Sequence, residues 1–204
     1  MKRFQISDFP ITEVAAELNK GAIMLYPTDT LTGIGCLGNN KEAIKKLFAI
    51  KKRDPSKPVS YAFSSLEMMS EYVELSAYVM KFKSLLPGKL TLVLPKKNDG
   101  AILHGVKSLN LGCRIPEVAW LLALISHLNA PLVATSANIS GTQPVKRVKD
   151  IPKNILDLVD IVIEWPGELL GVSSTVIDLT IKDEFKILRE GAISKDQIES
   201  LILD

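Results

Sequence analysis

Short apolar runs alternate along this chain with segments whose apolar residues recur every three or four positions. The runs AIMLY at 22–26 and LTLVL at 90–94 are nearly continuous, which is typical of strands buried on both faces of a sheet. PEVAWLLALISHL at 116–128 has the length and period of a mostly buried helix. This alternation predicts an α/β protein in which a twisted sheet of mixed parallel and antiparallel strands is flanked by helices.

Glycine, proline and capping residues mark the boundaries of the expected helices and strands. Strands are expected at 22–26, 59–63, 90–94, 109–115, 131–135, 159–163, 174–179 and 185–189. Helices are expected at 12–20, from the Asn40 cap to 53, from a Ser64 capping box with Glu67, at 76–86, 116–128 and 152–158, and from Ser194 onward. The stretch PTDTLTGIGCLGN at 27–39 is expected to be a long loop, and residues 1–204 to form a single domain.

Charge and cysteine content exclude several classes of protein. A net charge of +2 is too weak to make duplex nucleic acid the main partner, although a local basic cavity is compatible with it. Cys36 and Cys113 form no CxxC pair and have no histidine at ligand spacing, which argues against disulfides and structural zinc. No signal peptide and no membrane-spanning run are recognisable, so we expect a cytoplasmic protein with no membrane contact.

Two familiar sequence motifs occur only in an incomplete form. GIGCLG at 33–38 fits the dinucleotide pattern GxGxxG, but PTDTLT separates it from the preceding strand and no acidic residue ends a second strand at the required spacing. Its glycines are better explained by tight turns or close approach to a ligand. Cys113 beside Arg114 is a weak nucleophile candidate, and His127 stands alone in an apolar helix; both are expected to be structural or surface residues.

Six polar loops lie at the ends of expected strands, and together they carry many hydrogen-bond donors. They are PTDT at 27–30, KKRDPSK at 51–57, CRIP at 113–116, TSANISG at 135–141, VSST at 172–175 and LREG at 188–191. Guanidinium, ammonium, hydroxyl and amide groups dominate, whereas carboxylates and imidazoles are scarce. Such a set predicts a basic concave cavity that binds an anionic, phosphate-bearing ligand and acts by positioning and charge neutralisation. Phosphoryl or nucleotidyl transfer is the chemistry that fits it.

The same segments, in the same order, resemble the signature of the YrdC-like family of threonylcarbamoyl-AMP synthases. The resemblance covers about residues 10–193 and includes PGKLTLVLP at 87–95 and GVSSTVIDL at 171–179. It implies a nucleotidyltransferase that joins L-threonine, bicarbonate and ATP into threonylcarbamoyl-AMP with release of pyrophosphate. Partner proteins would then use the product to modify tRNA.

The resemblance also implies roles for individual residues. It places Lys51, Arg53, Ser136 and Asn138 on the ATP phosphates as the catalytic set, and Arg189 beside the nucleotide. It places Thr28, Arg114 and Ser174 on threonine, with Arg114 the natural partner of its carboxylate. The sequence offers no carboxylate cage for a metal, so magnesium is expected to arrive on the ATP phosphates, with Asp29 the one nearby candidate ligand.

Several positions depart from the family pattern. Thr32 stands where an aromatic residue is usual, Ser173 where glutamate is frequent, and Lys89 and Glu190 where proline is common. These changes bear on the shape of the threonine pocket more than on the ATP site. A different reading of the same basic surface is a non-catalytic module that binds tRNA or double-stranded RNA. The polar segment 138–150 is a candidate lid over the substrate.

Overall fold

The computed structural model describes residues 1–54, 56–98, 103–104, 108–138 and 145–203 of the chain. Much of the candidate lid, residues 139–144, lies outside the described residues, so the lid stays a prediction. Among the described helices none has the length and apolar content needed to cross a bilayer.

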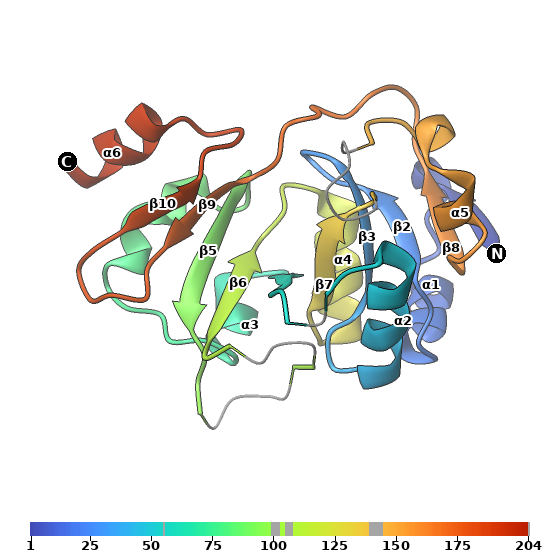
Figure 1. Ribbon diagram of the computed structural model, residues 1–204, viewed down its shortest axis with the longest axis horizontal. Coiled ribbons are helices and arrows are strands. Elements are labelled where there is room, and N and C mark those ends of the chain that lie inside the picture. The colour runs from blue at the N-terminus through green and yellow to red at the C-terminus, as the bar shows by residue number, and fades with distance from the viewer. Residues whose placement is uncertain (55, 99–102, 105–107, 139–144, 204) are drawn as a thin grey trace.

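The described strands form one ten-stranded sheet in the order β1-β8-β2-β3-β7-β4-β6-β5-β9-β10 (Figure 1). The strands are β1 (Lys2–Gln5), β2 (Met24–Pro27), β3 (Thr32–Leu37), β4 (Ser60–Ala62), β5 (Leu90–Pro95), β6 (Asn110–Arg114), β7 (Leu132–Ser136), β8 (Ile161–Glu164), β9 (Thr175–Asp178) and β10 (Lys186–Arg189). The helices are α1 (Ile11–Asn19), α2 (Lys41–Lys51), α3 (Leu66–Ser70), α4 (Ala119–Leu128), α5 (Lys153–Leu156) and α6 (Lys195–Leu203), with 3-10 helices at Ile6–Asp8, Val79–Leu85 and Val148–Asp150.

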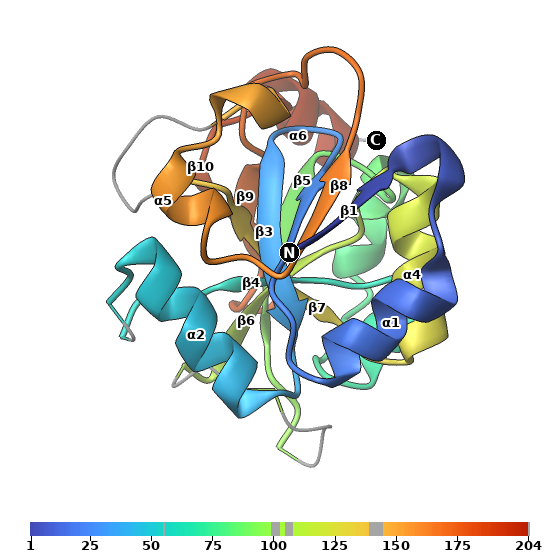
Figure 2. The same cartoon turned by 90° about the vertical axis from the view of Figure 1, so that its right-hand side faces the viewer.

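Parallel and antiparallel pairs occur in the same sheet. β8 runs parallel to both β1 and β2, and β4–β6 and β5–β9 are also parallel, whereas β2–β3, β3–β7, β4–β7, β5–β6 and β9–β10 are antiparallel. Helices cover the sheet on both sides: α2 lies on one side of β3, and α1 packs against α4 on the other (Figure 2). The prediction of a mixed sheet flanked by helices is confirmed.

Helix α2 begins where the sequence indicated. The Asn40 side chain accepts a hydrogen bond from the Ala43 N–H, which satisfies one of the donors that a helix start leaves open. The helix ends at Lys51, and Lys52 adopts the left-handed conformation that commonly closes a helix. At this helix end the Lys52 side chain is exposed to solvent, whereas Lys51 is buried and Arg53 is half-buried.

Strand β3 contradicts the predicted loop at 27–39. Glycines lower strand propensity, which is why the pattern TGIGCL was read as a loop. In the sheet Gly35 is needed because a Cβ there would lie 2.1 Å from the Val133 carbonyl oxygen of β7. The glycines therefore bring two backbones together within a strand, and only PTDT and its neighbours form a turn before it.

Other boundaries also differ from the predictions, and helix α2 ends at Lys51 although it was predicted to reach residue 53. The cap of α3 is Ser65, whose hydroxyl accepts the Met68 N–H, so the Ser64 capping box was wrong by one residue. Helix α4 begins at Ala119, because Val118 is still extended, and the segment predicted as a helix at 76–86 is the 3-10 helix Val79–Leu85. Strand β1 was not predicted, because its mostly exposed, polar residues at the sheet edge lack an apolar run.

Candidate active site

A cavity of about 230 Å³ lies where β2, β3 and β7 face residues from β5, β6 and β10. It is bordered by Tyr26, Thr28, Thr30, Leu31, Thr32, Gly33, Arg53, Pro58, Val59, Ser60, Thr91, Arg114, Ala134, Thr135, Ser136, Ser173, Ser174 and Arg189. Register explains part of the opening: Gly33 pairs with Ser136, and Gly35 pairs with Ala134, which in turn pairs with Ser60. Small side chains on neighbouring strands therefore leave space on this face of the sheet.

The cavity is cationic. Arg53, Arg114 and Arg189 line it, and no Asp or Glu occurs among its described lining residues. Burial lowers the pKa of Arg53 and of Arg189, and the Arg114 charge lowers the pKa of Arg189 further. Arginines remain charged even so, and their crowding is relieved when an anion binds. The arrangement favours a ligand with several negative charges.

Lys51 joins the end of α2 to the end of β7. Its side chain is 2% exposed, and its Nζ donates to the carbonyl oxygens of Ser136 and of Asn138, the latter at 2.7 Å. The Ser136 hydroxyl in turn donates to Asn138 Oδ1. Burial, and to a smaller extent the Arg53 charge, lowers the pKa of Lys51 to about 8. Lys51 therefore holds the Ser-x-Asn segment in place and is itself held there.

The four residues predicted to contact the phosphates lie close together, but only two of them line the cavity. Arg53 and Ser136 line it directly, whereas Lys51 and Asn138 lie behind that surface and contact Ser136. Arg53 donates from Nη2 to the Pro58 carbonyl oxygen at 2.6 Å, which fixes the guanidinium against the turn after α2. A residue that shapes a site by holding its neighbours cannot be told from a direct contact by sequence alone.

Arg114 is held from three directions. Its Nη2 lies 2.6 Å from Asp29 Oδ1, its Nη1 donates to Thr30 Oγ1 at 3.0 Å, and its Nε donates to the Gly88 carbonyl oxygen at 3.2 Å. The two partners of the ion pair are 11% and 7% exposed. Arg114 has five N–H groups, so two remain for a ligand carboxylate.

Asp29 is therefore a poor candidate for a metal ligand. One of its oxygens pairs with Arg114, and the other accepts the Glu117 N–H at 3.3 Å. Across the part of the chain that the structure describes, no three His, Cys, Asp or Glu side chains gather in a way that could hold a metal ion.

Thr28 and Ser174 line the cavity, but their hydroxyls already have protein partners. Thr28 Oγ1 accepts the N–H groups of Thr30 and Leu31, each at 3.1 Å, and donates to the Leu31 carbonyl oxygen at 2.7 Å. It therefore builds the turn between β2 and β3. Ser174 Oγ lies 2.8 Å from Thr91 Oγ1, and the Ser174 carbonyl oxygen accepts from Arg189 Nη2 at 2.9 Å.

Three residues that line the cavity were not predicted from the sequence to do so: Tyr26, Ser60 and Thr91. Tyr26 and Thr91 lie inside apolar runs and were read as strand residues only. The side-chain alternation of a strand could have placed Thr91 on the same face as Arg114, but only once the pairing of β5 with β6 was known.

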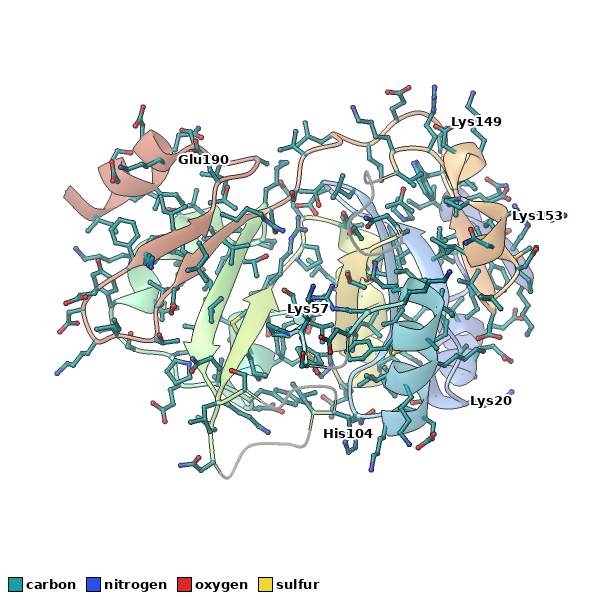
Figure 3. All side chains as sticks on the ribbon, viewed as in Figure 1. Lys20, Lys57, His104, Lys149, Lys153 and Glu190 are labelled. Carbon is teal, nitrogen blue, oxygen red and sulfur yellow. The ribbon has the colours of Figure 1, made fainter. Side chains whose placement is uncertain are left out.

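Figure 3 shows where several charged side chains lie relative to the sheet. Lys20, Lys149 and Lys153 lie at the periphery of the molecule in this view. Glu190, one of the departures from the family pattern, accepts the Lys195 N–H at 3.2 Å through its carboxylate. Lys57, which is exposed, lies toward the middle of the molecule in this view. Lys89, another departure, lies 3.6 Å from Glu117 on the surface.

The structure does not support Cys113 as a nucleophile. Cys113 is a free, fully buried thiol, and burial raises its pKa well above its usual range, so it stays protonated and inert. Cys36 is also free and buried, and His127 is exposed on α4, as predicted.

The chain is similar to proteins that are named threonylcarbamoyl-AMP synthase. The chain is 29% identical to the threonylcarbamoyl-AMP synthase of Bacillus subtilis over 96% of its own length and 57% of that protein. It is 34% identical to a putative threonylcarbamoyl-AMP synthase of Methanocaldococcus jannaschii, with 87% of this chain and 83% of that protein covered. The chain spans less than two thirds of the length of the bacterial relative.

One solved structure is also similar to this chain in its fold. The crystal structure of Pyrococcus abyssi Sua5 complexed with L-threonine matches 98% of this chain and 60% of that chain, with a TM-score of 0.87 and 29% identity. The family model Sua5/yciO/yrdC, described as telomere recombination, matches residues 16–191. The chain belongs to the Sua5/YciO/YrdC family.

Proposed function

We propose that this protein forms threonylcarbamoyl-AMP and pyrophosphate from L-threonine, bicarbonate and ATP. The observation that carries the proposal is the convergence of Arg53, Arg114 and Arg189 on one cavity without a lining carboxylate among the described residues. Relatives that carry the name threonylcarbamoyl-AMP synthase, and a similar fold crystallised with L-threonine, support the same reaction.

The residues of the cavity are assigned to two substrates. Arg53, Ser136 and Arg189 bind the ATP phosphates, with Lys51 and Asn138 fixing Ser136 from behind. Arg114 uses its two remaining N–H groups for the threonine carboxylate, next to the turn that Thr28 builds. The Ser174 carbonyl oxygen accepts a hydrogen bond from Arg189 Nη2 at 2.9 Å and so fixes that guanidinium.

The chemistry needs positioning and charge neutralisation more than proton transfer. The threonine amine forms an N–C bond with bicarbonate carbon, and water leaves to give the carbamate. A carbamate oxygen then attacks the α-phosphorus, and the bond between the α-phosphorus and its bridging oxygen breaks as pyrophosphate leaves. Both reactants are anionic, so fixed guanidinium groups lower the barrier by opposing their repulsion. Magnesium would reach the site on the ATP phosphates, because Asp29 is committed to Arg114.

A single assay tests this function. Purified protein should release pyrophosphate from ATP only when both L-threonine and bicarbonate are present. A non-catalytic RNA-binding module would give no such release, and its RNA affinity would fall steeply between low and moderate salt. Pyrophosphate release that is independent of threonine would point to a different acceptor. The downstream proteins that modify tRNA, and any direct contact with RNA, are part of this proposal and need separate binding measurements.

The pKa of Lys51 predicts an alkaline limit to activity. An ammonium group is charged below its pKa, so Lys51 is charged at neutral pH and loses that charge as the pH rises through about 8. We expect kcat/KM for ATP to fall above that pH. In Lys51→Arg, whose side chain stays charged, the fall in kcat/KM should begin at a higher pH.

Stability should change in the opposite direction over the same range. The pKa of Lys51 is near 8 in the folded protein and 10.5 in the unfolded chain, so between these values the unfolded chain binds more protons. Its contribution to the free energy of unfolding therefore rises with pH. Loss of activity without loss of thermal stability above pH 8 is the expected pattern, and an alkaline limb that is unchanged in Lys51→Arg would contradict this assignment.

A further inference from the structure

Arg189 reaches the cavity because of an irregularity in its strand. β10 lies at the edge of the described sheet, where its one neighbour is β9. The pairing of the two strands shifts by one residue between Ile187 and Arg189, so that Arg189 lies opposite Val176. A regular ladder would pair Arg189 with Thr175 and place its side chain on the other face of the sheet. The bulge therefore turns the arginine toward the cavity that it lines.

Within the described part of the chain, Ser174 is the only hydrogen-bond partner of the Arg189 guanidinium. Its carbonyl oxygen accepts from Nε at 3.2 Å and from Nη2 at 2.9 Å, and its Oγ accepts from Nη2 at 3.3 Å. These bonds use one edge of the guanidinium, so the two N–H groups of Nη1 remain for a ligand. Burial lowers the pKa of Arg189, and the Arg114 charge lowers it further because the two guanidinium groups repel each other. The orientation of Nη1 therefore depends on how firmly Ser174 is fixed.

Thr91 fixes the Ser174 hydroxyl from an interior strand. Its Oγ1 lies 2.8 Å from Ser174 Oγ, and the two residues are 3% and 7% exposed. Thr91 pairs with Val176 in the parallel ladder of β5 and β9, so its side chain shares the cavity face with Arg189. β5 has strands on both sides, β6 and β9, whereas β10 has only β9 among the described strands. A contact to β5 therefore ties the edge of the sheet to its interior.

We propose that Thr91 is a positioning residue for Arg189, which it holds in place through the Ser174 hydroxyl. The inference rests on the function proposed above, in which Arg189 binds the ATP phosphates. The Thr91 hydroxyl orients the free Nη1 edge before ATP binds. A donor that is already oriented stabilises a developing charge better than a mobile one, and Thr91 itself need not touch ATP for this effect.

Conservative substitutions remove or keep this contact. Thr91→Val removes the hydroxyl and keeps the branched shape of the side chain, whereas Thr91→Ser keeps the hydroxyl. Ser174→Ala breaks the same bond from the other side. Tyr61→Phe is the matched control for the loss of a buried hydroxyl: Tyr61 is fully buried, its Oη donates to the His104 carbonyl oxygen, and it is not among the described residues that line the cavity. Thr91→Val and Tyr61→Phe should both lower the melting temperature, because each leaves a buried group with one hydrogen bond fewer.

ATP binding separates the variants. The affinity for ATP is measured by calorimetry without L-threonine, and the KM values for ATP and L-threonine are measured by pyrophosphate release. Thr91→Val should bind ATP about tenfold more weakly and raise the KM for ATP by a similar factor, with the KM for L-threonine close to that of the parent. Ser174→Ala should lose at least as much ATP affinity as Thr91→Val. Thr91→Ser should restore that affinity, and Tyr61→Phe should keep it.

A double variant distinguishes positioning from direct contact. A residue that acts only through Arg189 has no effect once Arg189 is absent, so Thr91→Val should not weaken ATP binding further in an Arg189→Met protein. Losses that add in the double variant would overturn the proposal. It is also overturned if Thr91→Val or Ser174→Ala binds ATP as tightly as the parent, or if Thr91→Ser or Tyr61→Phe binds it as weakly as Thr91→Val. A rise in the KM for L-threonine alone would contradict it too, because Thr91 would then contact the acceptor.

Failure of the proposed function gives a different result. A parent protein that binds ATP but releases no pyrophosphate with L-threonine and bicarbonate would overturn the proposed reaction, while the calorimetry of the variants would still decide the role of Thr91. A parent protein that does not bind ATP would overturn both.

Discussion

Replacing Lys51 by methionine is expected to reduce threonine-dependent pyrophosphate release at least about a hundredfold, because one ammonium group supports two parts of the phosphate site. Its Nζ ties the carbonyl oxygens of Ser136 and Asn138 to the end of α2. Without it the Ser136 hydroxyl loses its fixed position, and a positive charge beside Arg53 is removed. The effect is measured as kcat/KM for ATP at saturating threonine and bicarbonate.

Lys52→Met is the matched control. It removes the same charge one residue further on, and Lys52 is exposed and already closes the helix in the left-handed conformation. Its activity should stay close to that of the parent. Methionine at 51 also leaves two buried carbonyl oxygens unpaired, so the melting temperature of each variant must accompany the rates. If Lys51→Met folds and keeps activity within about threefold of Lys52→Met, Lys51 is not part of the phosphate site.

The layer structure could be predicted because its causes are local. The runs that became β5, β7 and β8 are mostly apolar, and Asn40 can be recognised as a cap from its place before a helical pattern. Strand β3 could not be predicted in the same way. Its two glycines are unfavourable in an isolated strand, and only the close approach of β7 shows why they are needed.

The site was predicted at the level of segments rather than contacts. The resemblance brought the segments of Lys51, Arg53, Ser136 and Arg189 together, and the structure places them around one cavity. It could not say that Lys51 contacts backbone carbonyls, because a lysine's partner depends on where another strand ends. The same limit concealed the partner of Arg114. Asp29 is 85 residues away in the sequence and was read as a possible metal ligand.

Replacing Asp29 by alanine is expected to lower the free energy of unfolding by about 3 kcal/mol, because it leaves a buried guanidinium without its counter-charge. Arg114 cannot give up its proton, and only Thr30 Oγ1 and the Gly88 carbonyl oxygen would remain to it. Urea unfolding of the ligand-free protein measures the loss. Asp29→Asn keeps an oxygen acceptor at the same place and should lose less.

Two further variants show whether the effect comes from burial. Asp150→Ala breaks an ion pair of the same 2.6 Å length with Arg147, but those side chains are 42% and 41% exposed, so it should cost less than about 1 kcal/mol. Adding Arg114→Met to Asp29→Ala removes the unpaired charge and should restore much of the lost stability, although it abolishes threonine binding. If Asp29→Ala unfolds at the same urea concentration as Asp150→Ala, the Asp29–Arg114 pair does not support the fold. The Thr30 hydroxyl and the Gly88 carbonyl oxygen would then be sufficient to hold Arg114 in position.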